Sequence, residues 1–199
     1  MTAESDLFVH PQGLCESDEV GPGTRIWAFA HVMKGAVVGR DCNISDHVFI
    51  ETGARIGDRV TIKNQVMVWR GVEIGDDVFV GPGACFMNDA YPRSPRMALP
   101  AVAARYSDET RWLLRTRVET GATLGAGCLV LPAVRIGAYA MIAAGAVLTR
   151  DVPAHALVVG VPARRVGLVC RCGARLVAIR GAVRLCPRCD EKYDERAGG

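Results

Sequence analysis

Residues 44–80 read ISDHVF-IETGAR-IGDRVT-IKNQVM-VWRGVE-IGDDVF-V, and every sixth residue in this stretch is isoleucine or valine. The same spacing extends back to Phe8 and forward to Phe86, and it resumes in phase from Val118 to Leu148. A period of six is neither the helix period of about 3.6 nor the simple strand period of about two. It is typical of a parallel β-helix built from hexapeptides, in which each hexad forms one side of a triangular prism.

The residues in the sixth position are expected to point into the prism and stack as a column, an arrangement that suits branched side chains. Glycine recurs directly after the column, at Gly21, Gly39, Gly57, Gly75, Gly81, Gly125 and Gly137, where we expect tight corners of the backbone. The expected column residues are Phe8, Leu14, Val20, Ile26, Val32, Val38, Ile44, Ile50, Ile56, Ile62, Val68, Ile74, Val80, Phe86, Val118, Leu124, Val130, Ile136, Ile142 and Leu148.

The composition agrees with an all-β core and excludes some classes of protein. Half of the 199 residues are apolar and few are aromatic, and the formal net charge of +3 does not by itself indicate nucleic-acid binding. No stretch approaches the roughly 18 apolar residues of a membrane span. The first residues lack the pattern of a signal peptide. We therefore expect a cytoplasmic protein whose eight cysteines are reduced or bound to metal.

The hexad phase also predicts the domain boundaries. Residues 1–167 are expected to form the prism, interrupted by a long inserted loop at 87–117 that breaks the phase. A long loop inside a compact repeat fold is more often functional than accidental. Residues 168–199 are expected to form a separate tail, which carries four of the cysteines.

The segment that leaves the last coil has a distinctive sequence. Residues 145–167 read GAVLTRDVPAHALVVGVPARRVG. This segment resembles the terminal coil of hexapeptide-repeat acyltransferases that use coenzyme A. The resemblance implies a left-handed β-helix and a cosubstrate held at a subunit boundary, with its pantetheine arm on backbone groups and its phosphates on basic side chains. The residues carried over to that site are Ala126 and Ala144 for the arm, Pro162 in the exit motif, and Arg150, Arg164 and Arg165 for the phosphates. The alternative is that these arginines are merely solvated or cover the prism end.

Three further segments narrow the resemblance: GTRIWAFAHV at 23–32, DCNISDHVFIE at 41–51 and FMNDAYPRS at 86–94. Together they are similar to N-acetyltransferases that act on the 3-amino group of nucleotide-linked amino sugars, enzymes of bacterial polysaccharide and glycosylated-metabolite pathways. The resemblance implies acetyl transfer from acetyl-coenzyme A to a UDP- or dTDP-linked amino sugar. Met87 stands where the family usually has threonine, and residues 111–117 are unusually rich in arginine. Another acyl donor or another amine acceptor remains the alternative.

The chemistry requires little of the protein, because a neutral amine near a thioester gains mainly from positioning. None of the four histidines lies at 118–153. This absence agrees with the 3-N-acetyltransferase branch, for which the resemblance implies no histidine base. Asn88, at the mouth of the loop, is the catalytic candidate, because its side-chain carbonyl can orient the amine. The alternative is a simple turn residue beside Asp89.

Substrate-binding candidates lie in the first coils and in the loop. An aromatic face such as Trp27 can stack on a nucleotide base, or it can pack in a subunit interface. Histidines on a prism face can touch the sugar or its pyrophosphate, although such residues are usually plain surface. The candidates are Trp27, His31, His47, Asp89, Tyr91 and Arg93.

The tail contains two close cysteine pairs, Cys170 with Cys172 and Cys186 with Cys189. Two such pairs about a dozen residues apart indicate a zinc ribbon, in which four thiolates leave no open position and the metal is structural. Free thiols are the alternative. A tail that binds nucleic acid or a partner protein is a further possibility, but its arginines are balanced by acidic residues.

We also expect a homotrimer, because related prisms bind their cosubstrate between neighbouring subunits.

Overall fold

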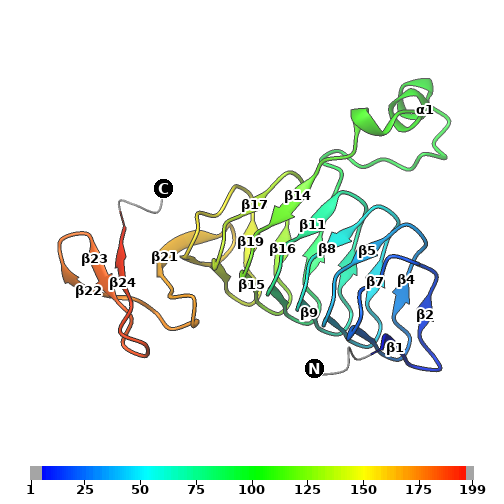
Figure 1. The fold of residues 1–199 in the computed structure, drawn as a ribbon. Coiled ribbons are helices and arrows are strands. Elements are labelled where there is room, and N and C mark those ends of the chain that lie inside the picture. The colour runs from blue at the N-terminus through cyan, green and yellow to red at the C-terminus, as the bar shows by residue number, and fades with distance from the viewer. Residues whose placement is uncertain (1–5, 196–199) are drawn as a thin grey trace.

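The computed structural model describes residues 6–195, which form a three-sided parallel β-helix followed by a small antiparallel sheet (Figure 1). An inserted loop projects from the side of the prism, and the small sheet lies beyond its last coil. The prediction of an all-β prism with an inserted loop and a four-cysteine tail is confirmed. No helix within residues 6–195 is long and apolar enough to cross a membrane.

Each side of the prism is one parallel sheet, to which the successive coils add strands; on the third side the first and last coils add only single bridges, at Val20 and Val152. Sheet I contains β1 (Phe8–Val9), β3 (Arg25–Ile26), β6 (Asn43–Ile44), β9 (Thr61–Ile62), β12 (Phe79–Val80), β15 (Thr123–Leu124), β18 (Met141–Ile142) and β20 (Ala156–Val159), with β21 (Arg164–Leu168) added antiparallel. Sheet II contains β2 (Leu14–Cys15), β4 (His31–Val32), β7 (Phe49–Ile50), β10 (Met67–Val68), β13 (Cys85–Phe86), β16 (Leu129–Val130) and β19 (Val147–Leu148). Sheet III contains β5 (Val37–Val38), β8 (Arg55–Ile56), β11 (Val72–Ile74), β14 (Thr116–Val118) and β17 (Arg135–Ile136).

The second residue of almost every strand points inward, as the hexad pattern predicts. In sheet I, Ile26 pairs with Ile44, Ile44 with Ile62 and Ile62 with Val80, and all four side chains are fully buried. Because like residues stack on like, the prism contains one continuous column of branched side chains without a break at the inserted loop. The residue before each column position faces outward, so the outer faces of the sheets are set by those residues.

The prediction was wrong for the first two column positions, Phe8 and Leu14. Val9 pairs with Ile26 and Cys15 pairs with Val32, so Val9 and Cys15 take the inward positions, while Leu14 is 50% exposed. The interval from Cys15 to Val20 is therefore one residue short of a hexad. Since both strands are apolar pairs, the sequence pattern alone does not show which residue of each pair points inward.

The glycines that follow the column are required by close stacking of the coils. A Cβ atom on Gly39 would lie 2.5 Å from the Gly57 carbonyl carbon, and one on Gly125 would lie 2.4 Å from the Ala144 nitrogen. Neither glycine has a positive φ. The expected reason, a tight turn of the backbone, is therefore replaced by the approach of the next coil.

The inserted segment is shorter than expected and contains helix. β14 begins at Thr116, so the break spans residues 87–115, with α1 at Pro100–Tyr106 and a 3₁₀ helix at Glu109–Arg111. Only Val102 of α1 is buried, so the helix lacks the apolar stripe by which an amphipathic helix is recognised in a sequence. The segment projects from the prism beside β14 (Figure 1).

The tail forms a three-stranded antiparallel sheet of β22 (Val177–Arg180), β23 (Val183–Leu185) and β24 (Lys192–Asp194). Its core within the described residues consists of Cys170, Leu176 and Cys186, with partly buried Leu168 and Tyr193 against them. Such a small core cannot stabilise a separate domain without a further constraint.

Candidate functional site

Asn88 lies where the chain leaves β13 and enters the inserted segment. Its side-chain N–H donates to the Arg70 carbonyl at 3.1 Å, and its backbone carbonyl accepts from the Leu114 N–H at 2.9 Å. The first bond orients the side-chain amide, and the second ties the backbone of Asn88 to the end of the inserted segment. Within the described residues the Asn88 Oδ1 atom has no hydrogen-bond partner. This half-buried side chain can therefore accept a hydrogen bond from a ligand through that oxygen.

Asp89, the next residue, holds the inserted segment together. Its carboxylate accepts hydrogen bonds from both terminal nitrogens of Arg105, from the Tyr106 hydroxyl at 2.7 Å and from the Tyr91 N–H at 2.8 Å. The Arg105 guanidinium, together with these donors, holds the pKa of the Asp89 carboxyl far below its ordinary value. This nearly buried carboxylate is committed to the loop itself, which sequence reasoning missed when it assigned Asp89 to substrate.

The other two loop candidates lie on its surface. Tyr91 is 78% exposed. Arg93 donates its N–H to the Tyr106 hydroxyl at 2.9 Å and turns its guanidinium back to the Pro92 carbonyl. Both side chains are accessible, and neither is fixed by a charged partner within residues 6–195.

The corner between sheets I and II, which we call corner I–II, carries aromatic side chains in the first coils. The Trp27 indole N–H donates to Asn43 Oδ1 at 2.8 Å. Phe29 and His47 occupy the same position in successive coils, and their rings stack with centroids 4.9 Å apart. Trp27 and His47 thus belong to one corner of the prism. His31 does not, since it faces outward from sheet II and pairs with Glu16 at 2.8 Å.

Further along, corner I–II loses its side chains. The position of Phe29, His47 and Gln65 is taken in later coils by Gly83, Gly127 and Gly145, all with positive φ and none with an atom within 4 Å of an added Cβ. Residues with side chains occupy the same left-handed conformation in the early coils, so the fold does not require glycine there. The bare strip leaves the backbone accessible from outside.

Ala126 and Ala144, the residues expected to line the pantetheine arm, lie on this bare strip. Both are exposed, and their backbone N–H groups have no hydrogen-bond partner within residues 6–195. An extended ligand rich in amides matches such a surface, because its carbonyl oxygens can accept hydrogen bonds from these N–H groups without clashing with protein side chains.

The three arginines expected to bind phosphate come together at the end of the prism. A cavity of about 270 Å³ lies between the last coil and the hairpin of β20 and β21, and Arg150, Arg164 and Arg165 all line it. Among the described residues neither Arg150 nor Arg164 pairs with a carboxylate. Asp151 also lines the cavity, and its Oδ1 accepts the Arg135 N–H at 2.8 Å. Pro162 follows a cis peptide bond in the hairpin turn and is outside the cavity lining.

A second, larger groove of about 540 Å³ lies along sheet III. Glu73, in its lining, accepts hydrogen bonds from Arg117 at 2.8 Å and from Arg115 at 3.2 Å. The Arg117 and Arg115 guanidinium groups lower the pKa of Glu73. The carboxylate is already satisfied within the chain, and we assign no ligand to this groove.

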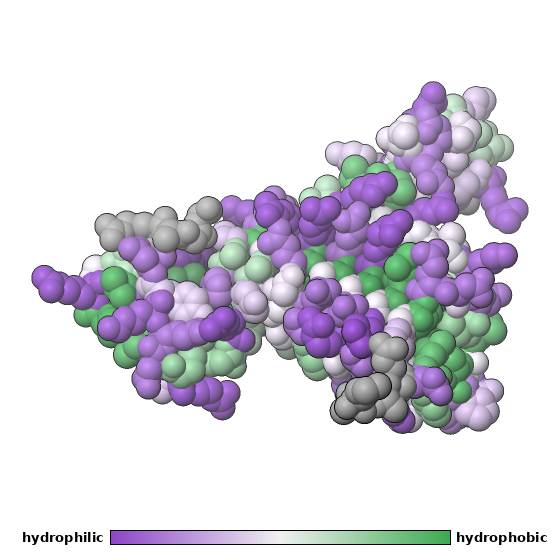
Figure 2. Space-filling model, in the orientation of Figure 1, coloured by the Kyte–Doolittle hydropathy of each residue, from purple (hydrophilic) through white to green (hydrophobic). Residues whose placement is uncertain are grey.

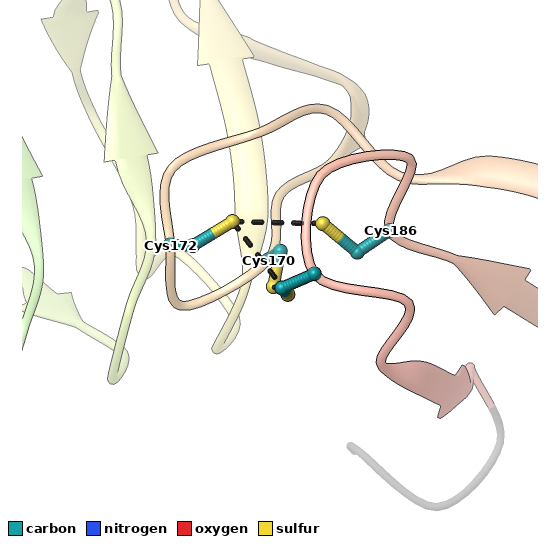
Figure 3. Close-up of side chains that lie close together, drawn as sticks. Cys170, Cys172 and Cys186 are labelled. Carbon is teal, nitrogen blue, oxygen red and sulfur yellow. Dashed lines mark hydrogen bonds between the residues drawn. The ribbon is translucent and has the colours of Figure 1, made fainter.

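The four tail cysteines form one cluster, although they come from two separate turns (Figure 3). Cys170 and Cys189 have sulfur atoms 3.4 Å apart, Cys172 and Cys186 3.5 Å, and all four sulfurs lie within 4.8 Å of one another. Thiolates bonded to a tetrahedral zinc at ~2.3 Å lie ~3.8 Å apart. The cluster therefore has the donor set and the size of a four-cysteine zinc site.

Comparison with known proteins identifies a matching family model, a relative along nearly the whole chain, and solved structures of the same fold. The family model "Bacterial transferase hexapeptide (six repeats)" matches residues 19–52 and 53–86. The dTDP-3-amino-3,6-dideoxy-alpha-D-galactopyranose 3-N-acetyltransferase of Aneurinibacillus thermoaerophilus is 42% identical over 194 residues, which cover 97% of this chain and 94% of that enzyme. The match includes the inserted segment and the tail.

Solved structures share the fold. A hexapeptide-repeat acetyltransferase from Vibrio cholerae, in complex with acetyl-coenzyme A, is 26% identical with a TM-score of 0.55, over 67% of this chain and 70% of that one. AntD, an N-acyltransferase from Bacillus cereus in complex with dTDP and coenzyme A, is 15% identical with a TM-score of 0.56, over 83% of this chain and 82% of that one.

Proposed function

Since this chain belongs to the hexapeptide-repeat N-acyltransferases, we propose that it transfers an acetyl group from acetyl-coenzyme A to the 3-amino group of a nucleotide-linked amino sugar, with dTDP as the favoured nucleotide. The observation that carries the proposal is the identity of 42% over nearly the whole length of a dTDP-3-amino-sugar N-acetyltransferase. The bare strip and the arginine cavity support it, because they suit the two ends of coenzyme A.

In the proposed site, acetyl-coenzyme A lies along corner I–II. The free N–H groups of Ala126 and Ala144 face its pantetheine arm, and Arg150, Arg164 and Arg165 meet its phosphates. A guanidinium suits a phosphate because its planar fork donates two parallel hydrogen bonds. The fit rests on two independent features of the chain, an accessible backbone and a basic cavity. Pro162 shapes the turn beyond the cavity and is assigned no direct contact.

The sugar nucleotide is assigned to the other half of the same corner and to the inserted segment. Trp27, Phe29 and His47 offer ring faces for a base. Tyr91 and Arg93 provide accessible polar groups near the start of the loop, and Asp89 fixes the loop that carries them. His31 faces outward from sheet II, away from corner I–II, and is better placed for contacts between subunits.

Asn88 is assigned the catalytic role. Its Oδ1 accepts a hydrogen bond from the sugar amine and directs the nitrogen lone pair to the thioester carbonyl. The new C–N bond forms while the C–S bond breaks, and the coenzyme A thiolate takes up the proton released by the amine. No basic side chain is needed for this step, because the neutral amine is already a good nucleophile.

The assembly that brings these parts together is proposed to be a homotrimer. The outer face of sheet II bears a stripe of apolar side chains, with Leu14 50%, Met67 46% and Leu129 38% exposed and Phe49 beside them. Hydrophobic surface is visible where β2, β4 and β7 lie (Figures 1 and 2). Outward-facing His31 interrupts the stripe at β4, and exposed apolar side chains gathered on one face in this way are typical of a protein interface.

We expect Met67→Glu to dissociate the trimer, because it places a charge in the middle of the apolar stripe. Light scattering should give a mass of three times 21.3 kDa for the native protein and about one chain for the variant. Val37→Glu, an equivalent outward position on sheet III, should leave the mass unchanged. A native protein that is monomeric at micromolar concentration would exclude both the assembly and the shared site.

The cysteine cluster is proposed to hold structural zinc. Four thiolates close the coordination shell, so this metal would supply folding free energy to the tail and no open position for chemistry. The structure contains all eight cysteines as free thiols, and we propose that the protein acts in the reducing cytoplasm.

Elemental analysis of protein purified without chelator should find one zinc per chain. Cys186→Ser should remove it, because Cys186 is buried in the tail core and contributes one of the four sulfurs. Cys15→Ser, in the first coil, should retain it. Absence of zinc from the native protein would show that the cluster holds free thiols.

The proposed activity is tested by thiol release from acetyl-coenzyme A with a panel of dTDP- and UDP-linked amino sugars. We expect release with a 3-amino sugar and none without an amine. Release with another acyl donor but not with acetyl-coenzyme A would identify a different member of the same class of reaction. No release with any amine would reject the proposal.

A further inference from the structure

One carboxylate of the tail joins the arginine cavity to the three-stranded sheet of the tail. Glu195 accepts a hydrogen bond from Arg165, which lines the cavity, and a second from Arg184 of β23 at 2.6 Å. The Glu195 N–H also donates to the Ala182 carbonyl at 3.0 Å. The tail therefore reaches back and holds one of the three cavity arginines at its guanidinium.

We propose that Glu195 is a positioning residue of the acetyl-coenzyme A site, and that metal binding by the four cysteines holds it in place. The inference rests on the proposed function, because it takes Arg165 as a contact for a coenzyme A phosphate. It goes further by giving the tail a role in the affinity for the cosubstrate.

The cluster of Arg165, Arg184 and Glu195 keeps a net positive charge, so Arg165 can still bind a phosphate. Arg165 and Arg184 together carry two positive charges, and Glu195 offsets one of them. A long guanidinium side chain that is 42% exposed would otherwise sample several rotamers. Glu195 binds one terminal nitrogen of Arg165 and leaves the remaining donors free for a ligand. Binding to a guanidinium that is already oriented avoids the entropy cost of ordering it.

The position of Glu195 depends on the cysteine cluster. Cys170 lies two residues after the end of β21, the strand that carries Arg165, and Cys189 lies three residues before the start of β24, which leads to Glu195. A metal bonded to both cysteines would cross-link the segment that follows Arg165 to the segment that precedes Glu195. Since two of the three buried residues of the tail core are themselves cysteines, loss of the metal removes the main constraint on the tail.

A second set of contacts fixes the tail against the prism. The rings of Tyr139 and His155 stack with centroids 5.3 Å apart, and the ring of Tyr193 from β24 meets His155 edge-on at 4.9 Å. His155 also accepts the Val169 N–H through its carbonyl at 2.8 Å. Because Tyr193 lies two residues before Glu195, these ring contacts help to fix the position of the Glu195 carboxylate beside Arg165.

The test measures coenzyme A binding by calorimetry, with no turnover involved. We expect Glu195→Gln to bind coenzyme A about 2- to 10-fold more weakly than the native protein, the range given by the cost of ordering one long side chain. Native protein depleted of metal by a chelator should show a similar loss. Glu19→Gln, an exposed glutamate of the first coil, is the matched control and should bind like the native protein.

Kinetics separate positioning from loss of structure. At saturating acetyl-coenzyme A, Glu195→Gln should reach the native kcat while its KM for acetyl-coenzyme A is raised by the same factor as the Kd. A fall in kcat with an unchanged KM would contradict the inference, as would tighter binding by Glu195→Gln, which would show that the carboxylate competes with phosphate.

The outcomes distinguish the two proposals. If the native protein does not bind coenzyme A, the proposed function fails. If the native protein binds coenzyme A, and Glu195→Gln or the metal-depleted protein binds it equally well, the proposed function stands and the present inference is overturned.

Discussion

Replacing Asn88 with alanine is expected to lower kcat about 100-fold, with kcat/KM for the sugar falling by the same factor. Loss of one positioned polar group at a reacting centre typically costs on the order of 10²- to 10³-fold in rate. The equal fall follows if the amine contact forms mainly in the transition state. Coenzyme A binding should be unchanged, since the three arginines assigned to its phosphates lie in a separate cavity.

Ser107→Ala provides the control for the inserted segment. Ser107 lies at the end of α1, and its hydroxyl donates only to the Ala104 carbonyl. This variant should retain native kinetics. If Asn88→Ala also retains native kinetics, Asn88 is a turn residue and the catalytic assignment is wrong.

Ile62→Asp is expected to unfold the prism. Ile62 is fully buried and stacks between Ile44 and Val80 in the middle of sheet I. A carboxylate there has no polar partner in the column, and burying an unpaired charge costs more than about 4 kcal/mol of stability. Circular dichroism and a thermal melt should show loss of the cooperative transition.

Thr61→Asp tests whether the effect depends on direction. Thr61 is the neighbouring residue on β9, and it faces outward. Substitution there should shift the melting temperature only slightly. A stable Ile62→Asp protein would mean that the inward and outward residues of this strand have been exchanged.

The fold was predictable from sequence because the column repeats in one phase, and each repeat restates the same pattern. The failure at Phe8 and Leu14 has a local cause, since each stands beside another residue that can be buried, Val9 and Cys15. The helix α1 was missed because its only buried residue is Val102, so no apolar period marks it.

The candidate site was predictable in part. The sequence placed Arg150, Arg164 and Arg165 in one short exit segment, and the structure brings all three to one cavity. Motif reasoning does not show which charges become partners within the chain. Asp89 therefore appeared as a substrate contact, and the pairing of Arg165 with Glu195 across thirty residues left no signal in the sequence.

The glycines of corner I–II illustrate a signal that was present and not used. Gly83, Gly127 and Gly145 stand where earlier coils have Phe29, His47 and Gln65. Comparing that one position between coils reveals the bare strip before any coordinates are seen. The comparison becomes meaningful only when the hexads are aligned by coil, in sets of three, instead of singly.

The most direct test of the central claim is nuclear magnetic resonance of the product formed from acetyl-coenzyme A and a mixture of dTDP-linked 3-amino and 4-amino sugars. The account predicts a single new amide at the 3-nitrogen, formed with release of one equivalent of thiol. Acetylation of the 4-amino sugar alone, or hydrolysis of acetyl-coenzyme A with both sugars unchanged, would contradict it.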